Sequence, residues 1–252
     1  MPRFKLTIEY DGGDYVGWQR QANGMSIQEA LEDAVRAFSG DTTEVAGAGR
    51  TDAGVHALAM TAHIDLTSDR FEAKRVRNAI NFYLRDHKIS VLSAEVAPPD
   101  FHARFAATRR RYLYRILNRS APPALEAGKV WFFPRSLDAK KMADAARPLL
   151  GKHDFTSFRA SHCQANSPEK TLDALEVSRV GDEVHIRAEA RSFLHHQVRN
   201  MVGTLTLVGE GKWRVGDVEK ALAARDRAKA GPTAPADGLY LVDVGYVGAP
   251  GC

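Results

Sequence analysis

A glycine-rich stretch at residues 47–57, GAGRTDAGVHA, contains the first side chains whose types and spacing could do chemistry. Three glycines fall within eight residues, and Arg50, Thr51 and Asp52 stand between them. Glycines on both sides let the backbone expose the carboxylate of Asp52, while a guanidinium and a hydroxyl beside it can orient it. The stretch is therefore a phosphate-binding loop, a plain turn between strands, or a loop that presents one carboxylate for catalysis.

The phosphate-binding interpretation fails at one position of this stretch. A dinucleotide-binding loop has the pattern G-x-G-x-x-G at the start of a helix. Gly47 and Gly49 fit that pattern, but Asp52 stands where the third glycine belongs, and its carboxylate would repel a pyrophosphate. No Gly-Lys-Ser/Thr follows, as a Walker loop requires, and the next residues alternate like a strand, so no helix N-terminus is available for phosphate. The turn remains open on spacing alone.

A second stretch, RFAATRRRYLYRILNR at residues 104–119, combines six arginines with two tyrosines in 16 residues. Basic groups interleaved with aromatic rings suit a polynucleotide surface, because the cations bind phosphates and the rings stack on bases. A strand with a solvated basic edge is the alternative. Tyr112, Tyr114 and Ile116 alternate onto one face, so not all three can line a pocket, and Tyr112 has a core position as its alternative role.

A third stretch, residues 192–208, is predicted to be a helix capped by Ser192. His195 and His196 precede Arg199 by four and three residues, so the three side chains would share part of one helix face. Adjacent histidines point about 100° apart on a helix, and no further ligand cluster stands near them in the sequence. Structural or RNA-backbone contacts are therefore expected rather than a metal site. A surface position is the alternative for Arg199.

The first half of the chain supplies the elements that must position the glycine stretch. Ser26 with Glu29 forms a capping-box pattern before a helical repeat, and alternate residues from Leu58 to Leu66 are expected to share one apolar face. The predicted elements are strand 4–10, helix 27–38, strand 43–48, strand 55–66, helix 76–84 and strand 89–96. Their order, β-α-β-β-α-β, is that of a ferredoxin-like unit.

The second half repeats this order without repeating the sequence. Its predicted elements are strand 108–118, helix 137–150, strands 171–180 and 183–190, helix 192–208, helix 215–225 and strand 239–246. We therefore expect an α+β fold of two ferredoxin-like halves, with antiparallel or mixed sheets flanked by helices, divided into domains 1–104 and 105–252. A cleft is expected where the halves meet, because sites favour such junctions.

Composition narrows the class of protein. The chain of 252 residues is 44% hydrophobic and 26% charged, as in ordinary globular proteins. Its apolar runs are far shorter than the roughly 20 residues of a membrane span, so no membrane association is expected. Two cysteines, Cys163 and Cys252, are too few for a disulfide framework, and a reducing cytosol is the expected compartment. A net charge of +4 does not by itself indicate nucleic-acid binding.

Six stretches of the chain resemble the tRNA pseudouridine synthase A family and occur in that family's order. They are EYDGGDYVGWQRQ (9–21), GRTDAGVHA (49–57), FHARFAATRRRYLY (101–114), DFTSFRA (154–160), FLHHQVRNMVG (193–203) and GLYLV (238–242). The resemblance spans nearly the whole chain. It implies the pseudouridine synthase fold, a cytoplasmic homodimer of two-domain subunits, no metal or organic cofactor, and isomerisation of uridine to pseudouridine at positions 38, 39 and 40 in the tRNA anticodon stem-loop.

The resemblance also implies roles for individual residues. The family's catalytic carboxylate falls on Asp52, and its active-site tyrosine falls on Tyr112. The basic residue beside the carboxylate falls on Arg199, the apolar contact below the base on Leu239, and a residue near the displaced base on Arg50. Contacts to the RNA backbone are expected from a further set of basic side chains, namely Arg109, Arg110, Arg111, Arg115, His195 and His196.

The chemistry of pseudouridine formation suits one ionised carboxylate. The C1′–N1 bond breaks, the uracil turns, and C1′ joins C5, so no redox or energy cofactor is needed. Asp52 could attack C1′, attack C6 of the uracil, or remove a proton from C2′, and these alternatives stay open. In each, burial would raise the pKa of the carboxyl group, and an arginine such as Arg199 would oppose that rise. The target uridine must also be flipped out of its stack.

Two other functions compete with this one. A non-catalytic RNA-binding protein of ferredoxin-like modules usually shows the pattern K/R-G-F/Y-G/A-F-V-x-F/Y, which this chain lacks. Most hydrolytic glycosidases place two carboxylates about the scissile bond, whereas the glycine stretch offers one. A binding module would keep its function without Asp52, and a hydrolase would release free uracil.

Overall fold

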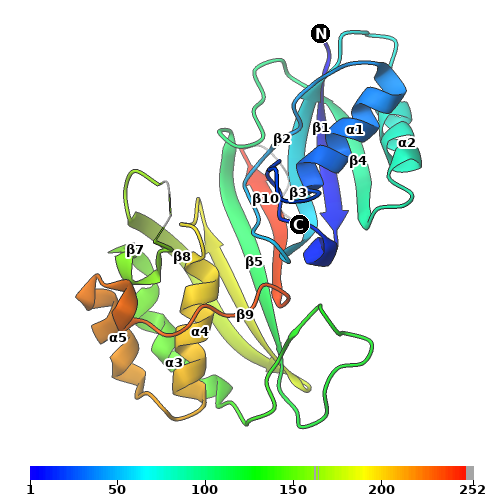
Figure 1. Cartoon of the computed structure of the whole chain (residues 1–252). Helices are drawn as coiled ribbons and strands as arrows, with labels where there is room; N and C mark the ends of the chain where they lie inside the picture. Colours follow the sequence, from blue (N-terminus) through cyan, green and yellow to red (C-terminus); the bar gives the residue numbers. More distant parts are fainter. Residues whose placement is uncertain (162, 164, 248–252) are drawn as a thin grey trace. The chain divides into compact units, whose positions relative to one another are not determined.

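The computed structural model describes residues 1–161, 163 and 165–247 and divides the chain into two compact units (Figure 1). Of the described residues, 1–108 and 240–247 form unit 1, and 109–239 form unit 2. The sequence suggested a division at 104/105 and assigned the last strand to the second domain. The compact unit 1 includes that strand, because its first residues pair with a strand of the N-terminal half.

Unit 1 has the strand order of a ferredoxin-like unit. The strand β1 (Arg3–Tyr10) lies between β3 (His56–Asp65) and β4 (Ile89–Ala97), and it is antiparallel to both. The short β2 (Ala46–Gly47) pairs antiparallel with the later part of β3, and β10 (Leu239–Tyr246) pairs in parallel with its beginning. The predicted β-α-β-β-α-β order is therefore confirmed, although the strand expected over 43–48 is only two residues long.

The alternation of β1 is also confirmed, because the side chains of Phe4, Leu6 and Ile8 are fully buried. The apolar face predicted for the strand 55–66 is confirmed from Met60 to Leu66 and is wrong at Leu58, which is 46% exposed. The opposite face of β3 is not left polar and open, since His63 is buried beneath Phe101 and His102. The chain after β4 covers that face, and alternation within β3 cannot reveal such a cover.

Two helices lie on one face of the unit 1 sheet (Figure 1). Helix α1 (Ile27–Ser39) begins where the Ser26 side chain accepts a hydrogen bond from the Glu29 amide, as the capping pattern predicts. It ends at Gly40, whose φ of 81° is a left-handed conformation that glycine adopts at little cost. Helix α2 (Ala73–Tyr83) follows β3 and packs on β4. Glycine and cap signals thus fix both ends of α1.

Unit 2 is built around a set of four antiparallel strands. Its strands are arranged β5-β9-β8-β7, with bounds Ala107–Leu117, Glu183–Ala190, Glu169–Val180 and Gly151–Asp154. The turn between β8 and β9 contains Gly181 with φ of 57°, so the predicted hairpin is confirmed. A short strand, β6 (Trp131–Phe132), pairs in parallel with β5. The helices α3 (Ala139–Ala146), α4 (Gln197–Gly209) and α5 (Val215–Ala224) flank these strands (Figure 1).

The start of α4 corrects the sequence-based prediction. Ser192 does not cap this helix, which begins five residues later at Gln197, with His196 as its N-cap at a φ of 62°. The histidine pair therefore precedes the helix instead of lying on it. The ring centroids of His195 and His196 are 4.0 Å apart, so the two rings lie close together and do not point about 100° apart as expected on a helix. The apolar stripe predicted for this helix, including Val198, Met201 and Leu205, is buried.

The α+β class expected from the sequence is confirmed, because the strands form a mixed sheet of parallel and antiparallel pairs that helices flank. Among the residues that the structure describes, no helix combines the length and apolar character that crossing a membrane would require.

Candidate active site

The glycine stretch forms a tight turn in unit 1 that presents Asp52. The carbonyl of Asp52 accepts a hydrogen bond from the Val55 amide at 3.1 Å, and Gly54 has a φ of 79°, which suits glycine. Thr51 before the turn is buried, whereas Asp52 is half-buried. Arg50 is exposed on the same loop. The sequence left two interpretations of this stretch, a plain turn and a loop that presents one carboxylate. Both descriptions apply, because the stretch is a tight turn that carries the half-buried Asp52.

The segment from Tyr10 to Trp18 holds this turn, and sequence reasoning missed its role. The Tyr10 hydroxyl is 2.8 Å from the Thr51 hydroxyl, and the Trp18 amide donates to the Thr51 carbonyl at 3.0 Å. The Gly12 amide donates to Nδ1 of His56, just after the turn. A signal was present in YDGGDYVGW, where glycines alternate with bulky aromatics as close backbone approach requires.

Tyr112 lies on β5 in unit 2, opposite Ala188 of β9. Its ring meets that of Phe193 edge to face, with centroids 5.2 Å apart. Tyr114 and Ile116 on the same face of the strand are fully buried, whereas Tyr112 is half-buried. Of these three side chains, Tyr112 is therefore the one with a surface left for a substrate.

Tyr114 serves the core instead. Its hydroxyl donates to the Pro235 carbonyl at 2.7 Å, and burial raises the pKa of Tyr114 well above its ordinary value of 10.0. The absent side chain of Gly238 leaves room for this ring, and the Gly238 carbonyl accepts from the Arg115 amide at 2.8 Å. The segment before β10 is thus fastened to β5.

Arg199 lies in the first turn of α4 and is half-buried. Its Nε donates to the Ala234 carbonyl at 2.8 Å, so the same segment is also fastened to α4. Leu239, at the end of this segment, is buried, and its amide donates to the Ala236 carbonyl. Within unit 2, the structure therefore ties Arg199 and Leu239 to one short stretch of chain that also contacts the strand of Tyr112.

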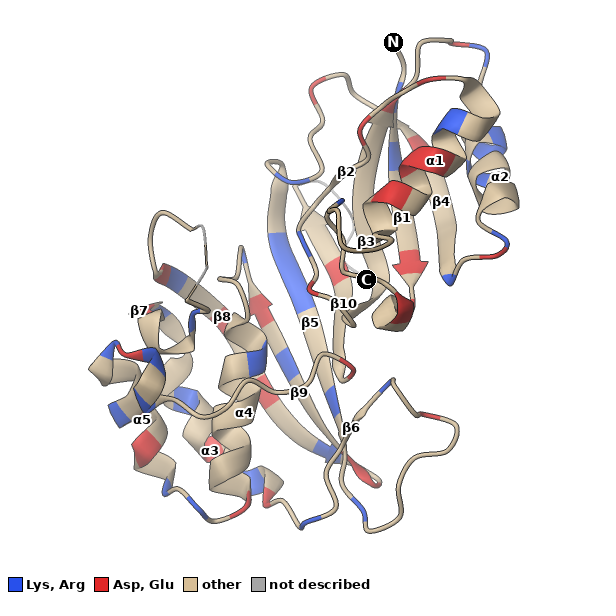
Figure 2. Cartoon of the chain, in the orientation of Figure 1, with Lys and Arg blue, Asp and Glu red and all other residues tan. Residues whose placement is uncertain are grey.

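The arginines of β5 have different surroundings. Arg109 and Arg111 each place Nε 4.0 Å from the carboxylate of Glu189, and they are only partly buried. Arg110 is 8% exposed, and it donates to the Arg191 carbonyl. Figure 2 shows basic residues along β5. Because their side chains are more exposed than that of Arg110, Arg109 and Arg111 are better placed to contact an RNA phosphate.

Arg115 is engaged by carboxylates. Its guanidinium binds both oxygens of Glu183, at 2.9 and 2.7 Å, and lies 2.9 Å from Glu126. The Arg115 hydrogen bond is the main cause that holds the pKa of Glu183 below its ordinary value of 4.5, and His185 adds to it. The phosphate contact expected for Arg115 would have to displace these carboxylates.

The remaining predicted residues lie in the segment before α4. His195 is exposed, and its amide donates to Sγ of Cys163 at 3.4 Å. Cys163 is buried, as expected for a small structural thiol, and Cys252 lies outside the described residues.

The residues predicted for the site are divided between the two units. Unit 1 contains Asp52 and Arg50. Unit 2 contains Tyr112, Arg199, Leu239, His195, His196 and Arg109–Arg111.

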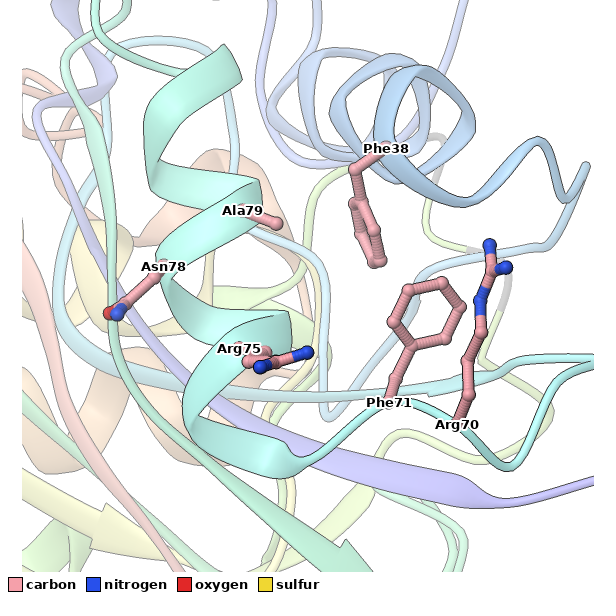
Figure 3. Close-up of a pocket in the computed structure, with 6 residues that line it drawn as sticks. All are labelled: Phe38, Arg70, Phe71, Arg75, Asn78 and Ala79. Carbon is pink, nitrogen blue, oxygen red and sulfur yellow. The ribbon is translucent and has the colours of Figure 1, made fainter.

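A hollow of about 580 Å³ lies elsewhere in unit 1, between the end of α1 and the start of α2. Figure 3 shows Phe38 and Phe71 facing each other there, with Arg70 and Arg75 at the sides. None of the residues predicted for the site lines it. This hollow is therefore separate from the residues that the sequence predicts for the active site.

Comparison with known proteins defines the class. A sequence model of the family described as tRNA pseudouridine synthase matches residues 6–106 and 145–247. The chain belongs to this family, whose members are isomerases that modify RNA.

Relatives match over nearly the full length. The chain is 61% identical to tRNA pseudouridine synthase A of Rhodospirillum centenum, over 98% of this chain and 100% of that protein. It is 60% identical to the protein of that name from a Caulobacter species, over 98% of this chain and 99% of the relative. For the protein from Nitrobacter winogradskyi the identity is 58%, over 99% and 97% of the two chains. The resemblance expected from six motifs is thereby confirmed.

Proposed function

We propose that the protein isomerises uridine to pseudouridine at positions 38, 39 and 40 in the anticodon stem-loop of tRNA, with Asp52 as the catalytic carboxylate. The observation that carries the proposal is the Asp52 turn, in which a buried threonine and a fixed backbone present one half-buried carboxylate. The name shared by relatives that align with 98% of this chain supports the choice of reaction and of RNA.

The roles proposed for the other residues follow from their exposure and contacts. The half-buried Tyr112 is available to stack its ring on a flipped base and to form a hydrogen bond through its hydroxyl. Arg199 supplies a positive charge that favours an ionised carboxylate, and Leu239 supplies apolar contact to the base. Arg50, exposed on the loop of Asp52, contacts the displaced nucleotide. Attack at C1′, attack at C6 and proton removal from C2′ all begin from the ionised form of Asp52.

Affinity for tRNA is proposed to come from the basic residues of unit 2. Arg109 and Arg111 are the main phosphate contacts because they retain exposure on one face of β5, with Arg110, His195 and His196 in supporting roles. We also propose, from the family resemblance, that the protein works in the cytoplasm as a homodimer. The reaction itself requires no co-reactant, since every atom of the uridine is kept in the product except the C5 proton, which exchanges.

The test replaces Asp52 by asparagine, which keeps the size of the side chain and removes its charge. We expect Asp52→Asn to bind tRNA normally and to release no tritium from tRNA labelled at uracil C5. Asp69→Asn, an exposed carboxylate of the same unit, is the control and should react at the wild-type rate. Near-normal release of tritium by Asp52→Asn would contradict the assignment of Asp52 as the catalytic carboxylate. Free uracil as product would show a hydrolase, and sites of modification other than 38, 39 and 40 would contradict the proposed positions.

A further inference from the structure

A buried hydrogen bond fixes the residue that precedes Asp52. The Tyr10 and Thr51 hydroxyls are 2.8 Å apart, and the two residues are 4% and 7% exposed. A hydroxyl buried at this depth needs a partner, because losing it costs the desolvation of the group left behind. The bond joins the last residue of β1 to a loop 41 positions away in the sequence, so it constrains tertiary structure and not a local turn.

The main chain of Thr51 is held from the same side. The Trp18 amide donates to the Thr51 carbonyl at 3.0 Å, so one segment binds both the side chain and the backbone of this residue. The Asp52 carbonyl is fixed in turn by the Val55 amide. Peptide groups on both sides of the Asp52 α-carbon are therefore anchored, and the direction of the Cα–Cβ bond that carries the carboxylate is set.

Two glycines allow the segment from Tyr10 to Trp18 to lie close to the loop of Asp52. Gly17 has a φ of 106°, and a β-carbon there would lie 2.7 Å from the Thr51 carbonyl oxygen. Gly47, at the start of the loop, lies under the Trp18 ring, where a β-carbon would meet ring atoms at 2.5 Å. Both positions exclude any larger residue without displacement of the loop. The loop is thus packed against the 10–18 segment along its length.

The segment itself is anchored in the core. Trp18 is 3% exposed, and its carbonyl accepts from the Gln28 amide at 3.0 Å. The Gly17 carbonyl accepts from the Ile27 amide at the first residue of α1. The Tyr10 and Trp18 rings pack with centroids 6.2 Å apart. Through these contacts the loop takes its position from β1 and α1, which are rigid elements and suited to hold a reacting group.

We infer that Tyr10 is a positioning residue for the reaction of Asp52: its hydroxyl holds Thr51 and so aims the carboxylate. The inference rests on the proposed function. It assigns to the EYDGG stretch a role in catalysis that is separate from RNA binding. A small displacement of a reacting group lowers the rate strongly without weakening substrate binding, because geometry matters most in the transition state.

The test removes one hydroxyl and leaves the ring. We expect Tyr10→Phe to lower the maximal rate of tritium release at saturating tRNA by about tenfold or more, while the dissociation constant for tRNA stays within about twofold of wild type. Thr51→Val, which has the same shape without the hydroxyl, should have the same effect. Thr51→Ser restores a hydroxyl and should recover most of the rate. The maximal rate of the double variant Tyr10→Phe/Thr51→Val should be only slightly lower than that of either single variant, because each single variant already removes the same Tyr10–Thr51 hydrogen bond.

A matched control separates positioning from stability. Tyr15 lies in the same segment and is 7% exposed, and its hydroxyl accepts from the Lys88 amide at 3.2 Å and lies 3.3 Å from His87. Tyr15→Phe should lower the melting temperature about as much as Tyr10→Phe and leave the maximal rate unchanged. A wild-type rate for Tyr10→Phe, or equal rate losses in both tyrosine variants, would overturn the inference. An inactive wild-type protein would instead refute the proposed function.

Discussion

Arg199 and Ala234 exchange two hydrogen bonds: Nε of the arginine donates to the alanine carbonyl at 2.8 Å, and the alanine amide donates to the arginine carbonyl at 3.1 Å. The arginine thus carries a charge and also fastens the segment that leads to Leu239. Gly203, one turn further along α4, is where a β-carbon would overlap the Pro232 carbonyl, so the helix and the segment are in direct backbone contact.

Replacement of Arg199 should separate these two roles. Arg199→Lys keeps the charge but not the Nε donor, and we expect a partial loss of kcat/KM for tRNA. Arg199→Ala removes both, and we expect a loss of about 100-fold or more, as for an electrostatic group at a reacting centre. Tritium release measures both. Lys220→Ala, a 79% exposed cation of the same unit, should react normally. Equal, near-normal rates in both Arg199 variants would contradict the role.

The arginines of β5 should act on affinity and not on chemistry. Arg111 stands opposite Glu189 on β9, with Nε 4.0 Å from the carboxylate. We expect Arg111→Ala to weaken tRNA binding. The slope of log affinity against log salt concentration should also become less steep, by the amount that corresponds to about one phosphate contact. Glu189→Gln removes the competing carboxylate and should tighten binding. The measurement is a salt titration of the dissociation constant, and an unchanged slope for Arg111→Ala would count against phosphate contact.

Local patterns in the sequence predicted the elements of unit 1 well. Alternation identified β1, and a cap with a terminal glycine identified α1, because those signals depend on neighbours within a few residues. The start of α4 was missed for the same reason. Ser192 has the local chemistry of a cap, but the chain continues to His196 and turns there with a φ of 62°. A positive φ at a residue other than glycine is set by tertiary packing, which no local signal shows.

The candidate site divides in a similar way. The loop pattern drew attention to Asp52 and the arginine run to Tyr112, but the roles predicted for both residues came from the family resemblance. The Tyr10–Thr51 bond spans 41 residues and could not be predicted from spacing. Equally, nothing in the run RRRYLYR separates Arg115, held by Glu183 and Glu126, from the arginines beside Glu189. Side-chain partners from other strands decide which cation is available.

The two tyrosines of β5 should respond oppositely to loss of the hydroxyl. Tyr114→Phe leaves the Pro235 carbonyl without its buried donor, and we expect the free energy of unfolding to fall by about 1–2 kcal/mol. Tyr112 is half-buried, so Tyr112→Phe should change stability by less than about 0.5 kcal/mol while lowering the rate of tritium release. Urea denaturation and single-turnover kinetics measure the two effects. Reversal of this pattern would mean that Tyr114 faces the substrate.

The Arg115–Glu183 pair should make stability depend on pH at the acid end. Because the arginine and His185 lower the pKa of Glu183 in the folded protein, the unfolded chain binds its proton more readily. The stabilisation is therefore complete above the ordinary value of 4.5 and is lost as the pH falls through the lowered pKa. Glu183→Gln should lower the free energy of unfolding at pH 7 by about 1 kcal/mol, since the pair is partly screened by solvent.

The difference between wild type and Glu183→Gln should shrink as the pH falls below the ordinary value of 4.5 and through the lowered pKa, because protonation then removes in the wild type the charge that the variant already lacks. Melting temperatures across that range measure it. Lys152 and Glu169 form an exposed ion pair in the same unit, at 3.3 Å, and Glu169→Gln should show a much smaller effect at every pH. If Glu183→Gln had the same stability as the wild type at every pH, the prediction would be contradicted. Glu126, which lies 2.9 Å from Arg115, would then be the carboxylate that neutralises the arginine, and replacing it would test this.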